Sequence, residues 1–490
     1  DRPLGPRSIV RLSVSTGSKA PAPSCPVVPM QPCAIPLSCV DKNNGGDMQA
    51  EKFSISVAAN PARGISRPRA YCWLVFIVIY ALMLSDYMSR QALNAVFPQL
   101  KAEWALSDAQ LGLLSGIVGL AVGLLAVPAA LMADRWGRVK SVVIMALFWS
   151  LSTLACGLAE HYNQLLLARL FVGIGEAGYG SVGLAIILSV FPSSMRATLT
   201  GAFTSAGMFG SVLGLASSGV IANHFGWRAA LIAMAALGFL LILFFAFTVT
   251  DARLARHRPL QLAESPVEGK CVEKIRLRSL LKTLFGAPTL VFTYVGSGLQ
   301  LFTAYTIIAW MPSYLNRYYD LPADKSALAA AVLLIASGLG MGLCGVFTDW
   351  VGRKSDKNKT LPAIFYCLGS CLLLMISMRL PPGTGQFAVI IAGVFFAAGT
   401  YGSAGAIVTD LVHVSLHGTA IATLALAGNL LGAAPGPYLT GLLADRIGLL
   451  GALQWVPLVS IGSALAFAFA RSHYLHDLRR HESSSCHQSR

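Results

Sequence analysis

Two stretches of the sequence, ALMADRWGRV at residues 130–139 and GVFTDWVGRK at residues 345–354, follow one pattern in the two halves of the chain. Each comes after a long apolar segment and contains an Asp, a Gly suited to a turn, and a basic residue directly after that Gly. A second pair, GVIANHFGWRAAL at 219–231 and GLLADRIGLLGAL at 441–453, aligns without gaps. The sequence therefore predicts two halves that are built alike.

The composition is that of a membrane protein. Hydrophobic residues make up 55% of the 490 residues and charged residues only 12%, whereas about 25% of an average soluble chain is charged. The net charge of +15 comes from basic residues scattered between apolar segments, so we expect no nucleic-acid partner. The ten cysteines form no CxxC pair and no Cys/His spacing typical of a metal site, so we expect no disulfide framework, metal or cofactor.

Twelve segments reach the length of about 20 mostly apolar residues that a membrane-spanning helix needs. Their predicted limits are 73–97, 109–133, 141–159, 165–190, 198–222, 229–250, 287–311, 327–348, 361–378, 387–412, 418–444 and 450–470. The polar segment 251–286 divides them into six and six. We therefore expect an all-α membrane protein with two pseudo-symmetric six-helix bundles, 73–250 and 287–470, and a ligand site between them near the bilayer midplane.

The distribution of Lys and Arg outside the spans predicts the orientation. Counted from Met48, 24 of these residues lie on the side of the amino terminus and six on the other side. Basic loops stay in the cytoplasm, so both termini, the segment 251–286 and the tail 471–490 are predicted to be cytoplasmic in a multi-pass protein of the cell membrane (plasma or inner). We expect residues 1–72 to form a cytoplasmic leader, in which residues 1–47 are either disordered or an artefact of the assigned gene start.

The two motif stretches resemble the loop motif GxxxD(R/K)xG(R/K)(R/K) of the major facilitator superfamily, with Ala130, Val139 and Trp350 as departures. The resemblance implies the fold expected above, with two gating loops that latch the outward-open state. The gating residues it implies are Asp134, Arg135, Gly137, Arg138, Asp349, Gly352, Arg353 and Lys354. The alternative is a pair of basic turns that only obey the positive-inside rule.

Five charged residues lie inside predicted spans, where a charge is costly and therefore a functional candidate: Asp86, Arg90, Arg169, Glu176 and Asp410. Asp410 lies close to the end of its span, which favours an interfacial position. The other four share two helix faces at similar depth, which indicates a cluster between spans one and four. We expect them to line a cavity; the alternative is a permanently paired quartet that fixes the packing.

YMSRQAL at 87–93, KAEWALSDAQLGLL at 101–114, GIGEAGY at 173–179 and FPSSMRATLTGAF at 191–203 narrow the resemblance to the spinster-like branch. Eukaryotic members of that branch export lysophospholipids or sphingosine phosphate, and bacterial relatives are proton-coupled. The resemblance implies that Glu176 is a protonation site and Arg90 its counter-charge or a headgroup ligand. Ser89 stands where the branch usually has Asp, so Asp86, one turn earlier, is the candidate substitute. Tyr87 and Tyr179 are candidate aromatic contacts.

These observations predict a monomeric secondary transporter that works by alternating access, coupled to protons, for a small organic or amphiphilic anion. An enzyme is not expected, because no nucleophile, base and orienting group occur together, and no GxxxxGK(S/T) loop indicates a primary pump. Two alternatives stay open: a drug or metabolite efflux pump of the same superfamily, and a transporter-like membrane sensor that binds a ligand without moving it.

Overall fold

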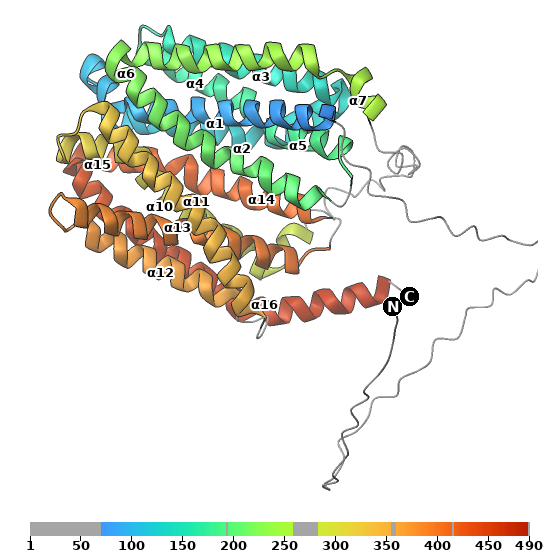
Figure 1. Ribbon diagram of the computed structural model, residues 1–490. Coiled ribbons are helices and arrows are strands. Elements are labelled where there is room, and N and C mark those ends of the chain that lie inside the picture. Colours follow the sequence, from blue (N-terminus) through green and yellow to red (C-terminus); the bar gives the residue numbers. More distant parts are fainter. Residues whose placement is uncertain (1–69, 193–194, 258–282, 354–358, 414–415, 489–490) are drawn as a thin grey trace, which may run out of the picture. The chain divides into compact units, whose positions relative to one another are not determined.

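The computed structural model describes residues 70–192, 195–257, 283–353, 359–413 and 416–488, which are helical throughout apart from short connections and contain no strand (Figure 1). Ten helical segments in this part of the chain are long and apolar enough to cross a membrane. Two of them have 51 and 64 residues. At about 1.5 Å per residue each exceeds twice the roughly 30 Å of a bilayer core, so each accounts for two spans. This agrees with the twelve predicted spans.

The first six spans come from six helices. They are α1 (Ala70–Trp104), α2 (Asp108–Trp136), α3 (Arg138–Gly157), α4 (Tyr162–Glu176), α5 (Tyr179–Val190) and α6 (Arg196–Thr248). Helices α4 and α5 together form span four, while α6 contains spans five and six. Gly226 divides α6, since its φ of 84° and ψ of 162° are suited to glycine and break the helix between the two spans.

The last six spans follow the short helix α7 (Asp251–His257). They are α10 (Pro288–Tyr318), α11 (Ala323–Gly352), α12 (Thr360–Ser377), α13 (Thr384–Asp410), α14 (His417–Gly428) continued by the π-helical η4 (Asn429–Ala433) and α15 (Pro435–Trp455), and finally η5 (Val456–Leu458) with α16 (Val459–Gln488). Gly448, with φ 77° and ψ 159°, divides spans eleven and twelve inside α15, at the place equivalent to Gly226 in the first half.

Equivalent helices pack alike in the two bundles. Gly210 and Gly214 of α6 face the backbone of α1, and Gly432 of η4 and Gly436 of α15 face the backbone of α10. Glycines at these positions let two helix backbones approach closely. Between the bundles, α2 packs on α15 and α6 packs on α11. The contact of span two with span eleven is thus matched by the equivalent contact of span five with span eight.

The bundles are in close backbone contact at one end, whereas glycines toward the other end have open space beside them. Gly112 and Gly116 lie so close to the backbone of the α15 region that a Cβ would collide with it. These glycines lie in the part of α2 near Asp108, at what we call the far end, which also carries Gly226 and Gly448 and lies on the left in Figure 1. Gly201 and Gly342 have nothing within 4 Å of an added Cβ. They lie toward the opposite end, the motif end, where α1 begins and α2 turns into α3.

Most of the predicted leader and of the predicted central segment lies outside the described residues, whereas the predicted tail continues α16 as far as Gln488. The leader is not described up to residue 69, and the segment 251–286 is described at α7 and from residue 283. The helices α1 to α16 belong to one compact unit, Ser66–Arg490. The leader, central loop and tail assignments therefore stay predictions.

Candidate functional site

Arg90 and Glu176 form an ion pair that joins α1 to α4. The Nη2 of Arg90 donates to Oε2 of Glu176 at 2.7 Å. The side chain of Glu176 is 0% exposed, whereas that of Arg90 is 24% exposed. A buried carboxylate must be paired or carry a proton, and Arg90 provides the pairing in this conformation. The pair therefore connects a fully enclosed acid with a base that can be reached from outside the bundle.

Asp86 is the second acid of this cluster. It lies one helical turn before Arg90 on α1, is 3% exposed, and is close enough to Glu176 and Arg90 for their charges to interact. Its Oδ1 and the Oε1 of Glu176 are buried without a hydrogen-bond partner among the described residues. Glu176 thus binds the guanidinium directly, Asp86 interacts with it through charge, and each carboxyl group has one oxygen without a hydrogen-bond partner among the described residues. Ser89, the position at which the spinster-like branch has Asp, donates its hydroxyl to the Asp86 carbonyl at 2.8 Å.

Arg169 does not complete a quartet of direct ion pairs. It is 1% exposed, and its guanidinium donates to the carbonyl oxygens of Leu114 and Arg90, both at 3.4 Å. Arg169 therefore ties α4 to the backbones of α2 and α1 and does not contact an acid directly. Its charge still acts on Glu176 over a longer distance. The permanently paired quartet is not what the structure contains.

The two candidate tyrosines have different surroundings. The guanidinium carbon of Arg90 lies 5.2 Å from the ring centroid of Tyr87, a cation–π contact that holds the arginine over the ring. Tyr179 is 0% exposed, donates its hydroxyl to the Ile79 carbonyl at 2.8 Å, and meets Trp149 edge-on at 5.0 Å. Tyr179 thus packs inside the first bundle, and we do not carry it forward as a ligand contact.

A central hollow lies between the bundles and includes Arg90. Its other lining residues come from α1, α2, α10, η4 and α15: Gln91, Asn94, Ser115, Val118, Gly119, Tyr305, Ile308, Ala309, Ala433 and Pro437. Arg90 is the one charged residue in this lining. The first bundle supplies most of the polar groups, whereas the second supplies Tyr305 and otherwise apolar side chains.

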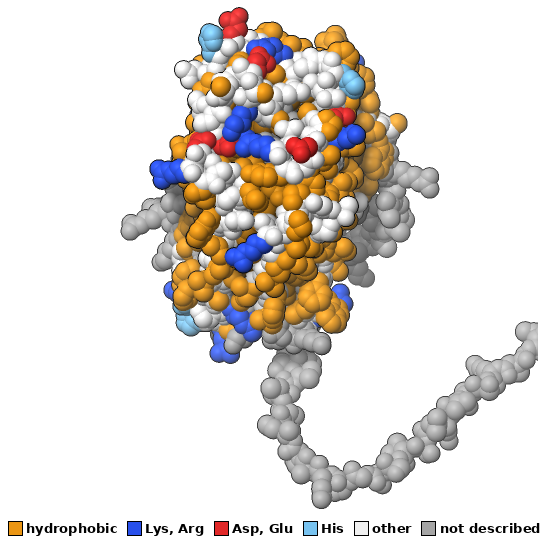
Figure 2. All heavy atoms as spheres, turned by 90° about the vertical axis from the view of Figure 1, so that its left-hand side faces the viewer, with side chains coloured by type: hydrophobic (Ala, Val, Ile, Leu, Met, Phe, Trp, Pro, Cys, Tyr) orange, Lys and Arg blue, Asp and Glu red, His pale blue; other side chains and the backbone are white. Residues whose placement is uncertain are grey.

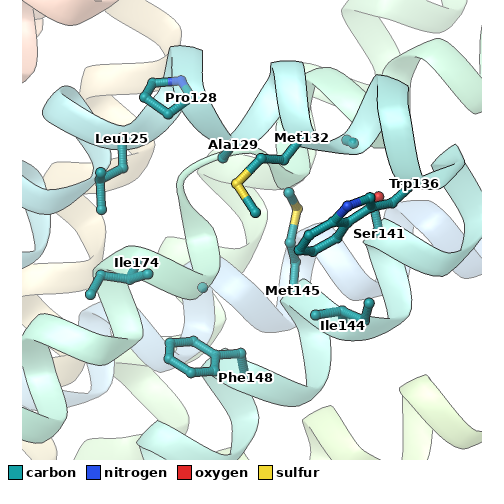
Figure 3. A pocket seen from close by; sticks show the side chains of 12 residues that line it. Leu125, Pro128, Ala129, Met132, Trp136, Ser141, Ile144, Met145, Phe148 and Ile174 are labelled. Atoms are coloured by element: carbon teal, nitrogen blue, oxygen red, sulfur yellow. The ribbon is translucent and has the colours of Figure 1, made fainter.

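A larger groove lies within the first bundle, between α2, α3 and α4 (Figure 3). Pro128, Met132, Trp136, Met145 and Phe148 are among its lining residues, and Figure 3 shows them around an apolar space. The groove includes none of the five charged residues of the spans. We therefore place the candidate ligand site in the smaller hollow between the bundles, because a ligand there can reach the charged side chain of Arg90.

The first predicted gating loop lies at the motif end. Gly137, with φ 93°, makes the turn between α2 and α3, in the left-handed region that favours glycine. Arg135 and Arg138 are exposed. Asp134 lies in the last turns of α2, but its side chain lies outside the described part of the structure.

The second predicted gating loop follows α11. Asp349 and Arg353 are exposed, and the Asp349 carbonyl accepts the Arg353 N–H at 3.2 Å. Gly352 is buried against the side chain of Lys359, and Lys354 lies outside the described residues. Asp410, at the end of α13, accepts from Lys359 at 2.7 Å and belongs to this end of the second bundle rather than to the central cluster.

A latch of charged groups closes the far end, and the sequence analysis did not predict it. Asp108, at the start of α2, accepts two hydrogen bonds from Arg317 of α10, at 3.0 and 2.6 Å, and one from Lys101 at 2.6 Å. Asp445 of α15 accepts from the backbone N–H groups of Asp108 at 2.7 Å and Ala109 at 3.0 Å. Arg317 and Asp445 belong to the second bundle, so both contacts cross the interface. Figure 2, which views this end, shows basic and acidic side chains gathered on it.

The start of α2 is built to receive these contacts. Ser107 caps the helix and forms a capping box with Gln110, which fixes where the first turn begins. The first N–H groups of a helix have no partner inside it, and they carry partial positive charge. The carboxylate of Asp445 satisfies two of them from the opposite bundle.

The sequence profile of the Major Facilitator Superfamily matches residues 79–437. Because this match covers more than half of the chain, the chain belongs to the major facilitator superfamily. A crystal structure of a bacterial homolog of the human lysosomal transporter spinster, inward-facing and unoccupied, superposes with a TM-score of 0.76 at 21% identity, covering 84% of this chain and 99% of that chain. This likeness confirms the fold of two six-helix bundles.

Curated relatives are transporters as well. The probable L-galactonate transporter of Escherichia coli K12 is 25% identical, with 82% of this chain and 90% of the relative covered. The hexuronate transporter of Bacillus subtilis 168 is 23% identical over 76% of this chain and 88% of its own length. Human protein spinster homolog 1 is 25% identical over 76% and 73%. The protein is thus a multi-pass membrane transporter and not an enzyme, as predicted, and its likeness to spinster proteins is confirmed.

The sequence analysis does not predict the far-end latch, although a repeated pattern in the sequence includes Asp445. The stretch ADRIG at 444–448 repeats ADRWG at 133–137, and the two lie at opposite ends of the molecule. The position of Asp445 against the start of α2 depends on how the two bundles meet. Spacing along one chain does not encode that contact directly.

Proposed function

We propose that the protein is a proton-coupled transporter that moves a small organic anion across the membrane by alternating access. The observation that carries this proposal is the position of Arg90. It is the one charged residue lining the central hollow, and it is bonded to the buried Glu176. An anion that enters the hollow competes with Glu176 for the same guanidinium.

This competition links anion binding to proton binding. When the anion takes Arg90, Glu176 loses its partner, and an unpaired buried charge costs several kcal/mol. A proton on Glu176 removes that cost, with Asp86 beside it as a second acceptor. When the anion leaves, Arg90 pairs again with Glu176 and the proton is released. The anion and the proton therefore bind together, which makes the transport a symport.

The alternating access is supported by the contrast between the two ends. Basic residues favour a cytoplasmic motif end and cytoplasmic termini, so this conformation is open to the cytoplasm and closed at the far end. Opening the far end requires the contacts of Asp108 and Asp445 to break. The gating residues at Asp134 and Asp349 then latch the motif end. We propose a monomer in the cell membrane as the transporting unit.

The substrate is compact and polar rather than long and apolar. L-galactonate and hexuronates, which name two of the relatives, are small carboxylates rich in oxygen. The lining of the hollow between the bundles contains two amides, two hydroxyls and one guanidinium among apolar side chains, and these polar groups suit such molecules. These carboxylates are therefore the first substrates to test.

The test uses purified protein in proteoliposomes and labelled L-galactonate and hexuronates. Wild-type protein should accumulate one of these anions when an inward proton gradient is imposed. Glu176→Gln should lose gradient-driven accumulation and still exchange labelled for unlabelled anion, because the amide no longer binds a proton. Glu160→Gln, an exposed glutamate at the far end, is the matched control and should behave as wild type.

Full gradient-driven accumulation by Glu176→Gln would overturn the proton coupling. Anion binding without any movement across the membrane in the wild type would favour the sensor alternative. Loss of binding in Arg90→Ala, with the protein still folded, is the expected result for the anion contact.

A further inference from the structure

Two neighbouring amide side chains lie beside Arg90 on α1 and have no role in the proposed proton step. Asn94 donates from Nδ2 to Oε1 of Gln91 at 2.8 Å. Both residues are buried, at 5% and 8% exposed, and both line the central hollow. The Oδ1 of Asn94 is buried without a partner among the described residues. The Nε2 of Gln91 makes no hydrogen bond within the described part of the chain.

An amide–amide hydrogen bond uses one donor and one acceptor of the pair. It leaves the carbonyl oxygen of Asn94 as an acceptor, and the amino group of Gln91 and the second N–H of Asn94 as donors. A buried acceptor without a partner costs free energy, about as much as a lost hydrogen bond. Gln91 and Asn94 therefore have hydrogen-bonding groups without partners among the described residues in the wall of the hollow, beside the guanidinium of Arg90.

We propose that Gln91 and Asn94 form a hydroxyl-recognition subsite, so that the transported anion is a hydroxylated carboxylate. This proposal rests on the proposed function, because it takes Arg90 as the ligand of the carboxylate group. A hydroxyl group both donates and accepts, which matches the acceptor left on Asn94 and the donor left on Gln91. A ligand without the hydroxyl leaves these groups unsatisfied and binds more weakly.

The spacing along α1 suits a short ligand. Arg90 and Asn94 are four residues apart and lie on the same face of the helix, about 6 Å apart along its axis. A carboxylate and a hydroxyl separated by a few carbon atoms span such a distance. Across the hollow, the second bundle offers Tyr305, whose side chain is partly exposed, as a further hydroxyl contact.

The experiment measures the affinity of the full-length protein, in detergent or nanodiscs, for two six-carbon carboxylates, L-galactonate and hexanoate. Hexanoate has the same chain length and charge but carries no hydroxyl group. Wild-type protein should prefer L-galactonate by about tenfold or more, the effect of one or two hydrogen bonds. Asn94→Leu should reduce this preference to near unity and leave the affinity for hexanoate unchanged or higher.

Controls separate the subsite from the anion contact and from the fold. Asn223→Leu, an exposed asparagine at the far end, should keep the wild-type preference. Arg90→Lys should weaken both ligands alike and keep the preference, which identifies a carboxylate contact independent of the subsite. Asn94→Ser, a smaller change, replaces Asn94→Leu if that variant does not fold, and it should show an intermediate preference.

Equal affinity of the wild type for the two carboxylates would overturn the subsite, and so would an unchanged preference in a folded Asn94→Leu protein. In either case the proposed function still stands, provided that Arg90→Lys weakens binding. If neither carboxylate binds to the wild type, both the subsite and the proposed function are contradicted.

Discussion

The far end and the motif end carry the same five-residue pattern, ADRxG, and the surroundings of the pattern differ between the two ends. At the far end, Asp445 of ADRIG bonds to the first N–H groups of α2 across the bundle interface. At the motif end, the side chain of Arg135 in the ADRWG turn is exposed, and that of Asp134 lies outside the described part of the structure. The comparison indicates that polar contacts across the bundle interface hold the far end closed in this conformation, and we propose that the motif end is held by an equivalent contact in the other conformation.

The largest effect is expected from Arg317→Ala at the far end. It removes two hydrogen bonds from the nearly buried Asp108 and leaves only Lys101 as its charged partner. Breaking a buried ion pair costs about 3–5 kcal/mol, and the partial exposure of Arg317 reduces this to about 2 kcal/mol. The far-end-open population should rise about 30-fold, measured as spin-label distances between positions 223 and 320.

Arg228→Ala is the matched control for that variant. Arg228 pairs with Glu103 at 2.6 Å, but both residues belong to the first bundle. Its loss should leave the distances between the bundles unchanged. A shift as large as that of Arg317→Ala would mean that far-end charge in general, and not the contact across the interface, holds the end closed.

Next in size is the effect of alanine at the two turn glycines. Gly137 and Gly448 have φ values of 93° and 77°, which alanine adopts at a cost of about 1–2 kcal/mol. Gly137→Ala and Gly448→Ala should lower the thermal stability of the solubilised protein by similar amounts, because the two turns share their backbone shape. A much larger loss of thermal stability for one of the two variants would show that the two turns are not structurally equivalent.

A smaller shift is expected from Asp445→Ala. This variant removes the carboxylate that accepts from the first two N–H groups of α2, while Ser107 still caps the helix. The loss is comparable to that of a capping side chain, about 1 kcal/mol. The far-end-open population should rise about fivefold in the same spin-label measurement. An unchanged distance distribution would remove Asp445 from the latch and leave the ion pair of Asp108 with Arg317 as the polar contact that holds this end closed.

The smallest effect on this conformation is expected at the motif end. Asp349 and Arg353 are exposed, and within the described residues the side chain of neither forms a hydrogen bond or ion pair with the first bundle. Asp349→Asn should change the stability of the purified protein by less than about 0.5 kcal/mol and still slow uptake, because the latch of the other conformation is weakened. Unchanged uptake would favour the alternative of a basic turn without a gating role.

The sequence predicts much of the fold and part of the site. The membrane spans and the two halves can be predicted because each crossing of the bilayer needs about 20 apolar residues. The pairing of Arg90 with Glu176 can be predicted because a charge inside the membrane costs free energy unless it is paired. The sequence does not predict the bonds of Arg169 to backbone carbonyl groups or the packing of Tyr179 inside the first bundle. They depend on which backbone atoms face each side chain, and helical spacing does not specify that. The latch at Asp108 was hidden for the same reason, since its partners lie in the other half of the chain.

The most direct test of the central claim, that the Arg90–Glu176 pair links anion binding to proton binding, is the proton flux that accompanies anion entry. Proteoliposomes holding a pH-sensitive dye receive external L-galactonate with the membrane potential clamped at zero. The account predicts internal acidification in step with uptake for the wild type, and none for Glu176→Gln, although the labelled anion still exchanges. Undiminished acidification in Glu176→Gln, or wild-type uptake without any acidification, would contradict it.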